Sequence, residues 1–388
     1  MHAPQILLSA GEASGDMYAA RLAAALKART GAAMFGMGGD QMRGAGVDVV
    51  TDYSEVSVLG ITEILSHLPQ LVRAMRRLVE MARARRPELA IVTDFPGFHL
   101  RLARKLKRLG VRNVYYICPQ FWAWRPWRVR IVQRRFALAL CIFPFEEKFF
   151  GDAGVPVKFI GHPLVGSVAS SLSRAEFFAK HSLSKSLPLV TILPGSRSSE
   201  LARHLSILRE ACVKIHNAMP VQFVVAAAPG WSEILRKSWA RELKLSTVEG
   251  ETYDALAHAN ASIVSSGTAT VEAALLGAPM VVVYRVTPLT ALLAKPLVRT
   301  KQFGMVNLIA GREVVPELIQ KDFTPGKVAQ QTLRLLQDPA AVSAMRADLA
   351  EVRRRLGPPG AVERAADAIA TLLTESPRNP DKLSGNAY

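Results

Sequence analysis

Two loops in the second half of the chain carry small residues beside a charged side chain, a combination suited to binding phosphate. Backbone N–H groups at a helix start attract anions, and an arginine adds a bidentate phosphate ligand. A glutamate one turn into the second helix can accept hydrogen bonds from both ribose hydroxyls. The two loops together favour a nucleotide diphosphate site. The predicted nucleotide contacts are Gly195, Ser196, Arg197, Ser266, Gly267, Thr268 and Glu272.

An ordinary helix-capping role is the alternative interpretation of these loops, and the spacing in the second loop argues against it. A capping box places its acidic residue three positions after the cap, whereas Glu272 follows Thr268 by four. No Asp-x-Asp pair, which would hold a diphosphate through a divalent metal, occurs in the sequence. We therefore expect no metal and no cofactor, and Arg197 and the helix N-termini would meet the charge of the leaving group.

Asp94 is the leading candidate for a general base. It follows an apolar segment that predicts a buried strand, and its apolar neighbours, Phe95 among them, should raise its pKa toward a useful value. A strand-end aspartate that caps the next helix is the alternative. Glu12 and His99 are rival bases, and His162 is better explained as a structural or nucleotide-contacting residue.

Residues 121–127 form an aromatic segment with interleaved basic charge. Such side chains can stack on bases or sugars, or lie at a membrane interface. An ordinary core cluster is the alternative. The candidate contact residues here are Trp122, Trp124 and Arg125.

The chain carries a formal net charge of +17 at pH 7, and most of the surplus lies in one stretch. Residues 73–135 hold 17 Lys or Arg and three acids. This concentration indicates a partner that bears phosphate, such as an anionic lipid surface or a phosphorylated substrate; solvated helix faces are the alternative. A nucleic-acid partner would leave the two phosphate loops unexplained, so we expect none.

Residues 63–86 show helical periodicity, with an apolar stripe beside six arginines. The pattern predicts either a core-packed amphipathic helix or one that lies in a membrane interface. No apolar run reaches the roughly 18 residues of a membrane span, and three scattered cysteines indicate a reducing compartment. We expect a cytoplasmic protein associated peripherally with the inner membrane. The predicted membrane contacts are Leu59, Ile64, Leu65, Leu68, Arg73, Arg76 and Arg77.

Short apolar segments alternate with helical ones along most of the chain, beginning with a strand over residues 5–9, a Gly-rich turn over 11–16 and a helix over 17–27. This alternation predicts an α/β fold: two Rossmann-like, doubly wound parallel-sheet domains facing a cleft. A Ser-rich stretch over residues 161–187 is the expected linker. We expect an N-terminal domain (1–165), a C-terminal nucleotide-binding domain (166–340), helices that pack on the first domain or a partner subunit (341–375), and a flexible tail (376–388).

Six motifs, in this order and spacing, resemble those of the lipid-A-disaccharide synthase family over about residues 5–370. They are Gly11-Glu12-Ala13-Ser14-Gly15-Asp16, Met37-Gly38-Gly39, Phe121-Trp122-Ala123-Trp124-Arg125, Pro194-Gly195-Ser196-Arg197, Ser266-Gly267-Thr268-Ala269-Thr270-Val271-Glu272 and Asn307-Leu308-Ile309-Ala310. The family is similar to two-domain, metal-independent glycosyltransferases of the GT-B type. The resemblance implies an inverting transfer from UDP-2,3-diacylglucosamine to 2,3-diacylglucosamine 1-phosphate, giving the β(1→6) lipid A disaccharide 1-phosphate and UDP. It also implies that the first domain (1–165) is the acceptor and membrane-side domain and the second (166–340) the UDP-sugar domain.

The same resemblance implies roles for individual residues. It assigns nucleotide contacts to Arg197, Glu272 and Asn307, and the base to Asp94. A UDP-sugar 2-epimerase with a similar two-domain plan is the alternative function, and a homodimer and the acyl-chain preference are left open. The implied acceptor and donor-sugar loops contribute Glu12, Ser14, Gly15, Asp16, Trp122, Trp124 and Arg125.

Overall fold

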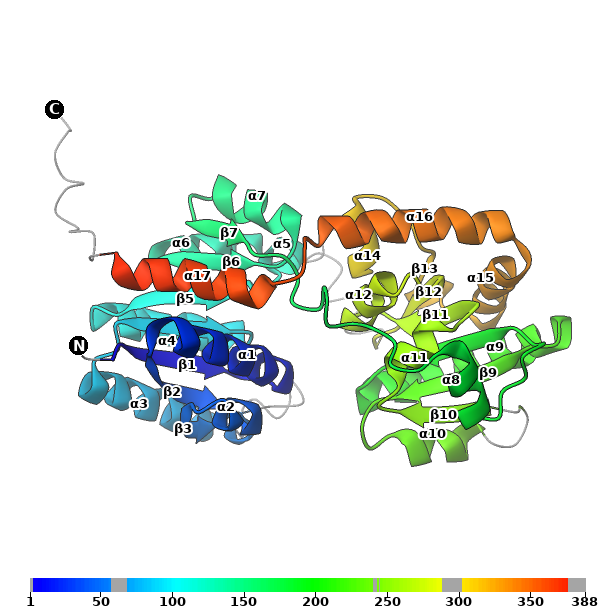
Figure 1. The fold of residues 1–388 in the computed structure, drawn as a ribbon, viewed down its shortest axis with the longest axis horizontal. Coiled ribbons are helices and arrows are strands. Elements are labelled where there is room, and N and C mark those ends of the chain that lie inside the picture. Colours follow the sequence, from blue (N-terminus) through cyan, green and yellow to red (C-terminus); the bar gives the residue numbers. More distant parts are fainter. Residues whose placement is uncertain (1–2, 57–67, 240–242, 244, 288–301, 376–388) are drawn as a thin grey trace. The chain divides into compact units, whose positions relative to one another are not determined.

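The computed structural model describes residues 3–56, 68–239, 243, 245–287 and 302–375. The chain divides into two compact units, one made of Met1–Pro163 with Pro359–Tyr388 and the other of Leu164–Pro358 (Figure 1). Each unit holds one sheet in which every described strand pair is parallel. The predicted α/β fold with two doubly wound parallel sheets is therefore confirmed.

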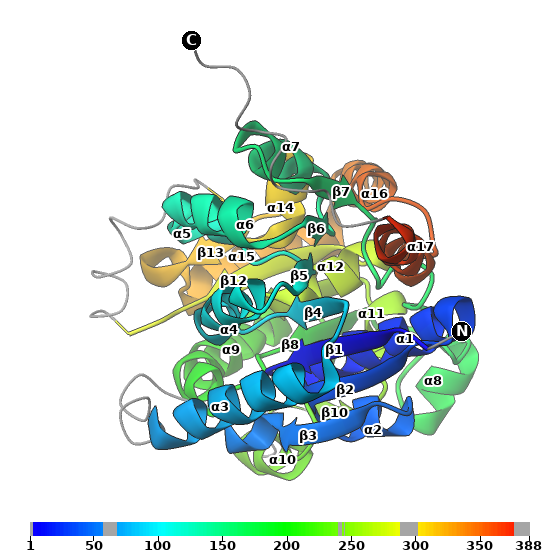
Figure 2. The ribbon, with the colours of Figure 1, turned by 90° about the vertical axis from the view of Figure 1, so that its left-hand side faces the viewer.

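The first unit contains a seven-stranded sheet of order β3-β2-β1-β4-β5-β6-β7. Its central strands are buried along their whole length, because helices cover both faces of a parallel sheet. In Figure 2, α3, α4 and α6 lie on one face of this sheet and α1 and α17 on the other. The strands are β1 (Gln5–Ala10), β2 (Ala33–Gly38), β3 (Asp48–Asp52), β4 (Leu89–Thr93), β5 (Arg112–Tyr116), β6 (Leu138–Cys141) and β7 (Val157–Phe159). The helices are α1 (Ala13–Thr30), α2 (Asp40–Gly44), α3 (Leu68–Arg85), α4 (Pro96–Arg108), α5 (Phe121–Trp124), α6 (Val129–Arg135), α7 (Pro144–Asp152) and α17 (Ala361–Thr374), with 3-10 turns η1 (Tyr53–Glu55) and η2 (Pro126–Arg128).

The second unit contains a six-stranded sheet of order β10-β9-β8-β11-β12-β13. The strands are β8 (Leu189–Leu193), β9 (Gln222–Ala227), β10 (Leu245–Glu249), β11 (Ala261–Ser265), β12 (Met280–Tyr284) and β13 (Glu317–Ile319). The helices are α8 (Arg174–Lys180), α9 (Ser198–Ala218), α10 (Ser232–Trp239), α11 (Thr252–Ala257), α12 (Thr268–Leu275), α14 (Met305–Ala310), α15 (Pro325–Gln337) and α16 (Pro339–Arg355), with the 3-10 turn η3 (Gln320–Asp322).

Helix α1 begins at Ala13, four residues before the predicted start at Met17. The expected Gly-rich turn is therefore only partly a turn, since Gly15 and Asp16 lie within the first turn of the helix. The sequence favours a turn because glycine destabilises a helix interior. In the structure, residue 15 must be a glycine because the Asp94 carboxyl leaves no room for a side chain.

The predicted linker is, from Leu164 onward, packed structure in the second unit. Its serines and α8 lie against α11, where the Asp254 carboxylate accepts hydrogen bonds from the amides of Ser171 and Leu172, both at 2.7 Å. The Ser170 hydroxyl donates to the same carboxylate at 2.7 Å. These three donors therefore fix residues 170–172 to the second unit, which a flexible linker would not show.

The two C-terminal helices belong to different units. Helix α16 packs on α12 and α14 of the second unit. Helix α17 packs on α1 of the first, where Arg29 pairs with Asp367 at 2.6 Å and Arg364 donates to the Ile160 carbonyl at 2.8 Å. Within the described residues, no helix is both long enough and apolar enough to span a bilayer.

Candidate active site

The predicted site residues of the first unit follow adjacent strands. Glu12 comes after β1, Asp94 after β4 and Trp122 after β5, and these strands are neighbours in the sheet. Because the carboxyl ends of parallel strands share one edge, the three residues stand along the same edge of the sheet, where open α/β sheets bind ligands.

The Asp94 carboxyl lies against the N-terminus of α1. Its Oδ1 accepts a hydrogen bond from the Gly11 amide at 2.9 Å. Its Oδ2 is buried and, among the described residues, has no hydrogen-bond partner. Burial raises the pKa of Asp94 to about 8, against the lowering effect of hydrogen bonds from the Gly11 and Glu12 amides, and the charge of Glu12 raises it further. A carboxyl group so poised can serve as a general base near neutral pH.

The backbone at Asp94 is strained, and the Asp94 side chain packs directly against Gly15. Asp94 and Phe95 adopt left-handed φ angles of 52° and 35°, a conformation that non-glycine residues rarely take. A Cβ added at Gly15 would stand only 1.6 Å from Asp94 Oδ2. Helix α1 can approach the end of β4 this closely only because residue 15 lacks a side chain.

His99, the rival base, is fully buried beneath Asp94. Its Nδ1 lies 3.1 Å from the Asp94 carbonyl and its Nε2 lies 2.8 Å from the Ser9 hydroxyl. Burial lowers the pKa of His99 to about 4. The Tyr115 hydroxyl donates to the same Asp94 carbonyl at 2.8 Å. His99 and Tyr115 therefore support the Asp94 backbone, and neither exposes a side chain.

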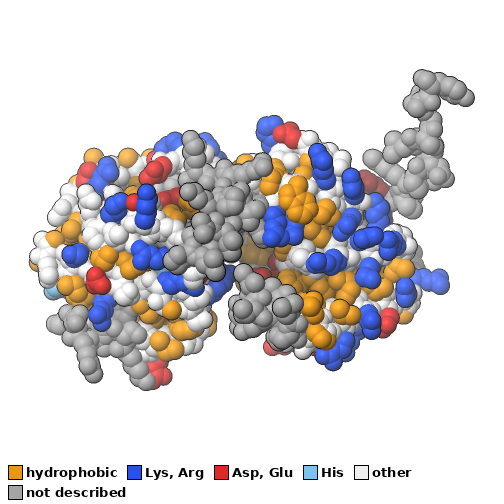
Figure 3. Space-filling view, turned by 180° about the vertical axis from the view of Figure 1, so that it is seen from behind, with side chains coloured by type: hydrophobic (Ala, Val, Ile, Leu, Met, Phe, Trp, Pro, Cys, Tyr) orange, Lys and Arg blue, Asp and Glu red, His pale blue; other side chains and the backbone are white. Residues whose placement is uncertain are grey.

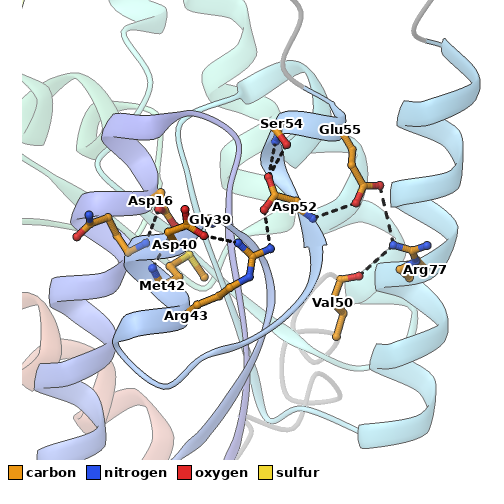
Figure 4. Close-up of polar contacts among 11 residues, drawn as sticks. Asp16, Gly39, Asp40, Met42, Arg43, Val50, Asp52, Ser54, Glu55 and Arg77 are labelled. Carbon is orange, nitrogen blue, oxygen red and sulfur yellow. Dashed lines mark hydrogen bonds and ion pairs between the residues drawn. The ribbon is translucent and has the colours of Figure 1, made fainter. Parts of the chain in front are cut away.

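The remaining residues of the first loop have different surroundings. Glu12 and Ser14 are exposed, whereas Asp16 is buried. Asp16 accepts hydrogen bonds from the amides of Gly39, Gln41 and Met42 at 2.6, 3.0 and 3.3 Å, so it holds the start of α2 (Figure 4). Its carboxylate is thus committed to the fold instead of pointing out as a sugar ligand.

His162 lies at the end of the first unit and is buried. Its ring is 5.4 Å from that of Phe143, and burial lowers its pKa to about 4. A buried neutral imidazole of this kind fits the structural one of the two roles that the sequence left open.

In the second unit, one pocket of about 530 Å³ lies at the carboxyl ends of β8, β9 and β11. It brings together seven of the eight predicted nucleotide contacts, although the two loops are about 70 residues apart in sequence. The lining residues among these are Gly195, Ser196, Arg197, Ser266, Gly267, Thr268 and Glu272.

Glu200, which was not among the predicted site residues, accepts hydrogen bonds from the backbone amides of the first loop. Its Oε2 accepts from the amides of Ser196 and Arg197 at 3.1 and 3.3 Å, and its Oε1 pairs with the Arg197 guanidinium at 3.2 Å. A Cβ at Gly195 (φ +121°) would meet the same carboxylate at 2.7 Å. These amides are therefore already satisfied, and the Arg197 side chain, still 71% exposed, is the group of this loop that could pair with a phosphate. The signal was the glutamate three residues after Arg197, the capping-box spacing.

Glu272 is supported by a second residue that the sequence did not indicate. The Tyr253 hydroxyl donates to Glu272 Oε1 at 3.1 Å, and both side chains line the pocket. Burial raises the pKa of Glu272, while the tyrosine hydrogen bond lowers it. Tyr253 lies in α11, distant in sequence, so no local pattern links the two residues.

The structure does not bring Asn307 to this pocket. Asn307 is fully buried in α14; its amide nitrogen donates to the Val315 carbonyl and to Glu317, and its oxygen accepts from the amides of Val314 and Val315. These bonds hold the segment after α14 and the start of β13. In this conformation Asn307 presents no surface to a nucleotide.

The predicted membrane contacts divide into three groups. Leu59, Ile64 and Leu65 lie outside the described residues. Leu68 on α3 is 46% exposed, whereas Met75, Leu78 and Val79 of the same stripe are core residues. The core-packed interpretation is therefore right for the second half of this helix.

The arginines of α3 point outward, with differing partners. Arg73 and Arg76 are exposed. Arg77 donates to the Val50 carbonyl at 3.1 Å and pairs loosely with Glu55 at 3.9 Å, so it ties α3 to β3 and η1 (Figure 4). Figure 3 shows Lys and Arg side chains spread over the visible face of the first unit, with few acidic ones among them.

Across the described residues, no group of three or more His, Cys, Asp or Glu side chains is arranged to hold a metal ion. Comparison with known proteins then identifies the chain: residues 6–370 match the family described as lipid-A-disaccharide synthetase. The chain belongs to the lipid-A-disaccharide synthase family. It is 46% identical to the lipid-A-disaccharide synthase of Solibacter usitatus over 95% of this chain and 98% of that one, and 42% identical to that of Myxococcus xanthus over the same shares.

Solved structures of other proteins share the fold of this chain. The calicheamicin glycosyltransferase CalG4 superposes with a TM-score of 0.60 at 17% identity, covering 97% of this chain and all of that one. The UDP-GlcNAc 2-epimerase of Neisseria meningitidis, bound to UDP-GlcNAc, gives a TM-score of 0.60 at 11% identity over 96% and 100% of the two chains. At these identities the likeness shows a shared GT-B fold. Family membership therefore favours the glycosyltransferase over the epimerase alternative.

Proposed function

We propose that this enzyme transfers 2,3-diacylglucosamine from its UDP derivative to 2,3-diacylglucosamine 1-phosphate, releasing UDP and forming a β(1→6) disaccharide 1-phosphate for lipid A. The single observation that carries the proposal is the second-unit pocket, which assembles both predicted phosphate loops and Glu272 in a chain of the lipid-A-disaccharide synthase family.

The pocket suits a nucleoside diphosphate. The exposed Arg197 guanidinium would pair with the diphosphate, and the amides at the start of α12 would meet the other phosphate oxygens. Glu272, held by Tyr253, would accept the ribose hydroxyls. In this proposal the charge that develops on the leaving UDP is stabilised by fixed protein donors.

In the first unit, Asp94 would take the proton from the acceptor hydroxyl as that oxygen attacks the anomeric carbon. The raised pKa of its carboxyl suits this role. Inversion follows when one carboxylate activates the acceptor and no covalent sugar–enzyme bond forms. Glu12 is exposed beside Asp94 and is the remaining candidate for the base.

We also propose that the first unit meets an anionic membrane surface, from which both acylated substrates would be taken. The exposed Leu68 and Val72 on α3 lie beside Arg73 and Arg76, a combination of apolar surface and basic charge that suits lipid headgroups. The enzyme would then act at the cytoplasmic face of the inner membrane.

The decisive assay supplies the purified enzyme with UDP-2,3-diacylglucosamine and 2,3-diacylglucosamine 1-phosphate in detergent micelles. We expect UDP and a disaccharide 1-phosphate in equal amounts, and no UDP when the acceptor is left out. UDP release without disaccharide, or conversion of the donor to an epimer, would contradict the proposal.

A further inference from the structure

The indole of Trp122 is held by a carboxylate that has no part in the proposed chemistry. Glu146, in the first turn of α7, has no exposed surface. Its Oε1 accepts a hydrogen bond from Trp122 Nε1 at 3.1 Å, and its Oε2 accepts from the amides of Ile142 and Phe143 at 3.3 and 3.2 Å. A buried carboxylate is costly unless donors surround it, so these three N–H groups account for its presence. Glu146 thereby connects α5 to the end of β6.

The Trp122 ring is also fixed from a second direction by aromatic side chains. Phe145 meets it edge-on, with ring centroids 4.9 Å apart and planes at 87°. Phe145 in turn stacks on Phe143 at 5.7 Å, and Phe143 packs on His162 at 5.4 Å. Trp122 keeps part of its surface open to solvent. The indole thus has its N–H group bonded and its ring held by an aromatic contact, with a part left exposed.

We propose that Glu146 is a positioning residue that fixes the indole of Trp122 as a platform for the glucosamine ring of the acceptor. The inference rests on the proposed function. Trp122 follows β5, the strand next to β4 and its terminal Asp94, so the platform and the proposed base stand on the same sheet edge. The C–H faces of sugars pack on aromatic rings, and an indole that is already ordered avoids the entropy cost of fixing it upon binding.

A purely structural role for Glu146 would be capping of α7 through the Phe143 amide. Such a role acts equally whether or not residue 122 carries an indole N–H group. A positioning role requires that N–H group. The two roles therefore differ in the coupling between residues 146 and 122, which a double-mutant cycle measures while the capping contribution cancels.

The test compares Glu146→Gln, Trp122→Phe and the double variant with the unmodified enzyme. Glutamine keeps the size of the side chain but offers one acceptor oxygen where three N–H groups converge. Trp122→Phe keeps a ring and removes the donor. Glu147→Gln is the matched control, because Glu147 accepts from the Phe159 amide at 2.9 Å and is exposed.

The first readout needs no activity. In enzyme labelled with 5-fluorotryptophan, the Trp122 resonance is identified by its loss in Trp122→Phe. We expect Glu146→Gln to shift this resonance and Glu147→Gln to leave it in place. We also expect each single variant, Glu146→Gln and Trp122→Phe, to raise the acceptor KM about tenfold, the effect of losing a hydrogen bond to a charged group, with a smaller change in kcat. Adding Glu146→Gln to Trp122→Phe should change KM little further.

An unchanged acceptor KM in both single variants, or the same rise from Glu146→Gln with and without the indole, would overturn the inference. If Glu146→Gln does not fold, Trp122→Phe alone carries the KM test, since it leaves Glu146 in place. Should the unmodified enzyme form no disaccharide, the proposed function has failed. The inference is then judged by titrating 2,3-diacylglucosamine 1-phosphate against the Trp122 resonance, where an absent response overturns it.

Discussion

At the scale of single residues, the carboxylates of the two sites differ because their surroundings differ. Asp94 lies in a buried position with one oxygen unpartnered, and its pKa is raised to about 8. Glu200 is also buried, but its carboxylate accepts hydrogen bonds from two backbone amides and pairs with the Arg197 guanidinium. The first is suited to exchange a proton and the second to hold a loop. Left-handed backbone at Asp94 and Phe95 adds strain at the position that is proposed to react.

We predict that Asp94→Asn lowers turnover by roughly 10²–10⁴-fold, the usual contribution of a general base, and leaves UDP binding unchanged. In the unmodified enzyme, kcat/KM should rise with pH and level off above about 8, as Asp94 loses its proton. Rate measurements between pH 6 and 9 with calorimetry of UDP binding test both points. A profile that is already flat at pH 6 would contradict the role of Asp94 as the base.

The Asp94 carboxyl group should also make the free energy of unfolding depend on pH. Its pKa is higher in the folded chain (about 8) than its ordinary value of 3.8, so the folded state keeps a proton that the unfolded state releases. The contribution of Asp94 to the free energy of unfolding therefore falls as pH rises from about 4 to about 8. Asp94→Asn removes this term, and the difference in melting temperature between variant and unmodified enzyme should grow in favour of the variant over that range.

We predict that Arg197→Ala reduces turnover by about 10²–10³-fold, because it removes a donor aimed at developing charge. The fold should survive, since the side chain is 71% exposed. Arg203→Ala, in α9 directly after this loop but outside the pocket, is the matched control. Turnover should not depend on Mg²⁺ in either protein, and a strict metal requirement or full activity of Arg197→Ala would contradict the proposed handling of the diphosphate.

Sequence reasoning predicts candidate site residues where they follow a strand, and it misses residues whose contacts are made with a distant element. Asp94 and the loop around Gly267 are visible because strand, turn and helix follow one another in the chain. Tyr253 and Glu146 act across elements, and their partners are set by packing that no local pattern encodes. Asn307 is implied by the resemblance, but its side-chain bonds go to Val314, Val315 and Glu317 and not to the pocket.

At the scale of elements, the start of α1 shows why a glycine can mislead. Gly15 was expected in a turn because glycine weakens helices. In the structure it lies in the first helical turn, where a Cβ would collide with the Asp94 carboxyl at the end of β4. The constraint comes from a strand about 80 residues away. The strands themselves were predictable, because fully buried parallel strands appear as unbroken apolar runs.

We predict that Gly15→Ala destabilises the enzyme by about 1–3 kcal/mol, the usual cost of overpacking, and abolishes most activity by displacing Asp94. Gly97→Ala is the matched control. Gly97 also lies in a first helical turn, but nothing stands within 4 Å of its added Cβ. Thermal melts should separate the two. Combining Gly15→Ala with Asp94→Ala should restore the melting temperature and leave activity low; a melt that stays low would show that the carboxyl is not the obstacle.

At the scale of the whole chain, the sequence did not show where the chain leaves the second unit and rejoins the first, which it does at Pro359. Residues 341–375 appeared as one helical region in the sequence, but α16 packs in the second unit and α17 on α1 of the first. Both helices are amphipathic. An amphipathic pattern predicts that one face of a helix is buried, but it does not identify the element that covers this face. The charge distribution is a property of the same scale, since 17 basic residues between 73 and 135 come from α3, α4, α6 and their connections.

These basic residues reinforce one another's positive field. Burial is the first cause that lowers the pKa of Arg128 and Arg135, and the neighbouring charges of Arg101 and Arg104, respectively, lower it further. Helices α3, α4 and α6 pack in sequence on one face of the sheet. The proposed membrane surface therefore extends beyond the apolar stripe of α3, and it should respond to charge and to apolar substitutions separately.

We predict that Leu68→Ser with Val72→Ser weakens binding to anionic vesicles at low and high salt alike, because apolar insertion does not depend on ionic strength. Both side chains are nearly half exposed, at 46% and 45%, so the fold should be unaffected. Arg73→Gln, Arg76→Gln and Arg104→Gln together should weaken binding mainly at low salt. Each basic residue near an anionic surface contributes about 1 kcal/mol, and this attraction fades beyond a Debye length of roughly 8 Å at physiological salt.

Co-sedimentation with phosphatidylglycerol vesicles at 50 mM and 500 mM salt measures both effects. Ile234→Ser, an equally exposed apolar residue of the second unit at 49%, is the control and should bind like the unmodified enzyme. If Ile234→Ser detaches as readily as the α3 variant, the surface that meets the membrane is not confined to the first unit. If neither the serine nor the glutamine variant changes binding, the outward face of α3 and α4 serves only to keep the enzyme hydrated, and its lipid substrates must reach Asp94 by another surface.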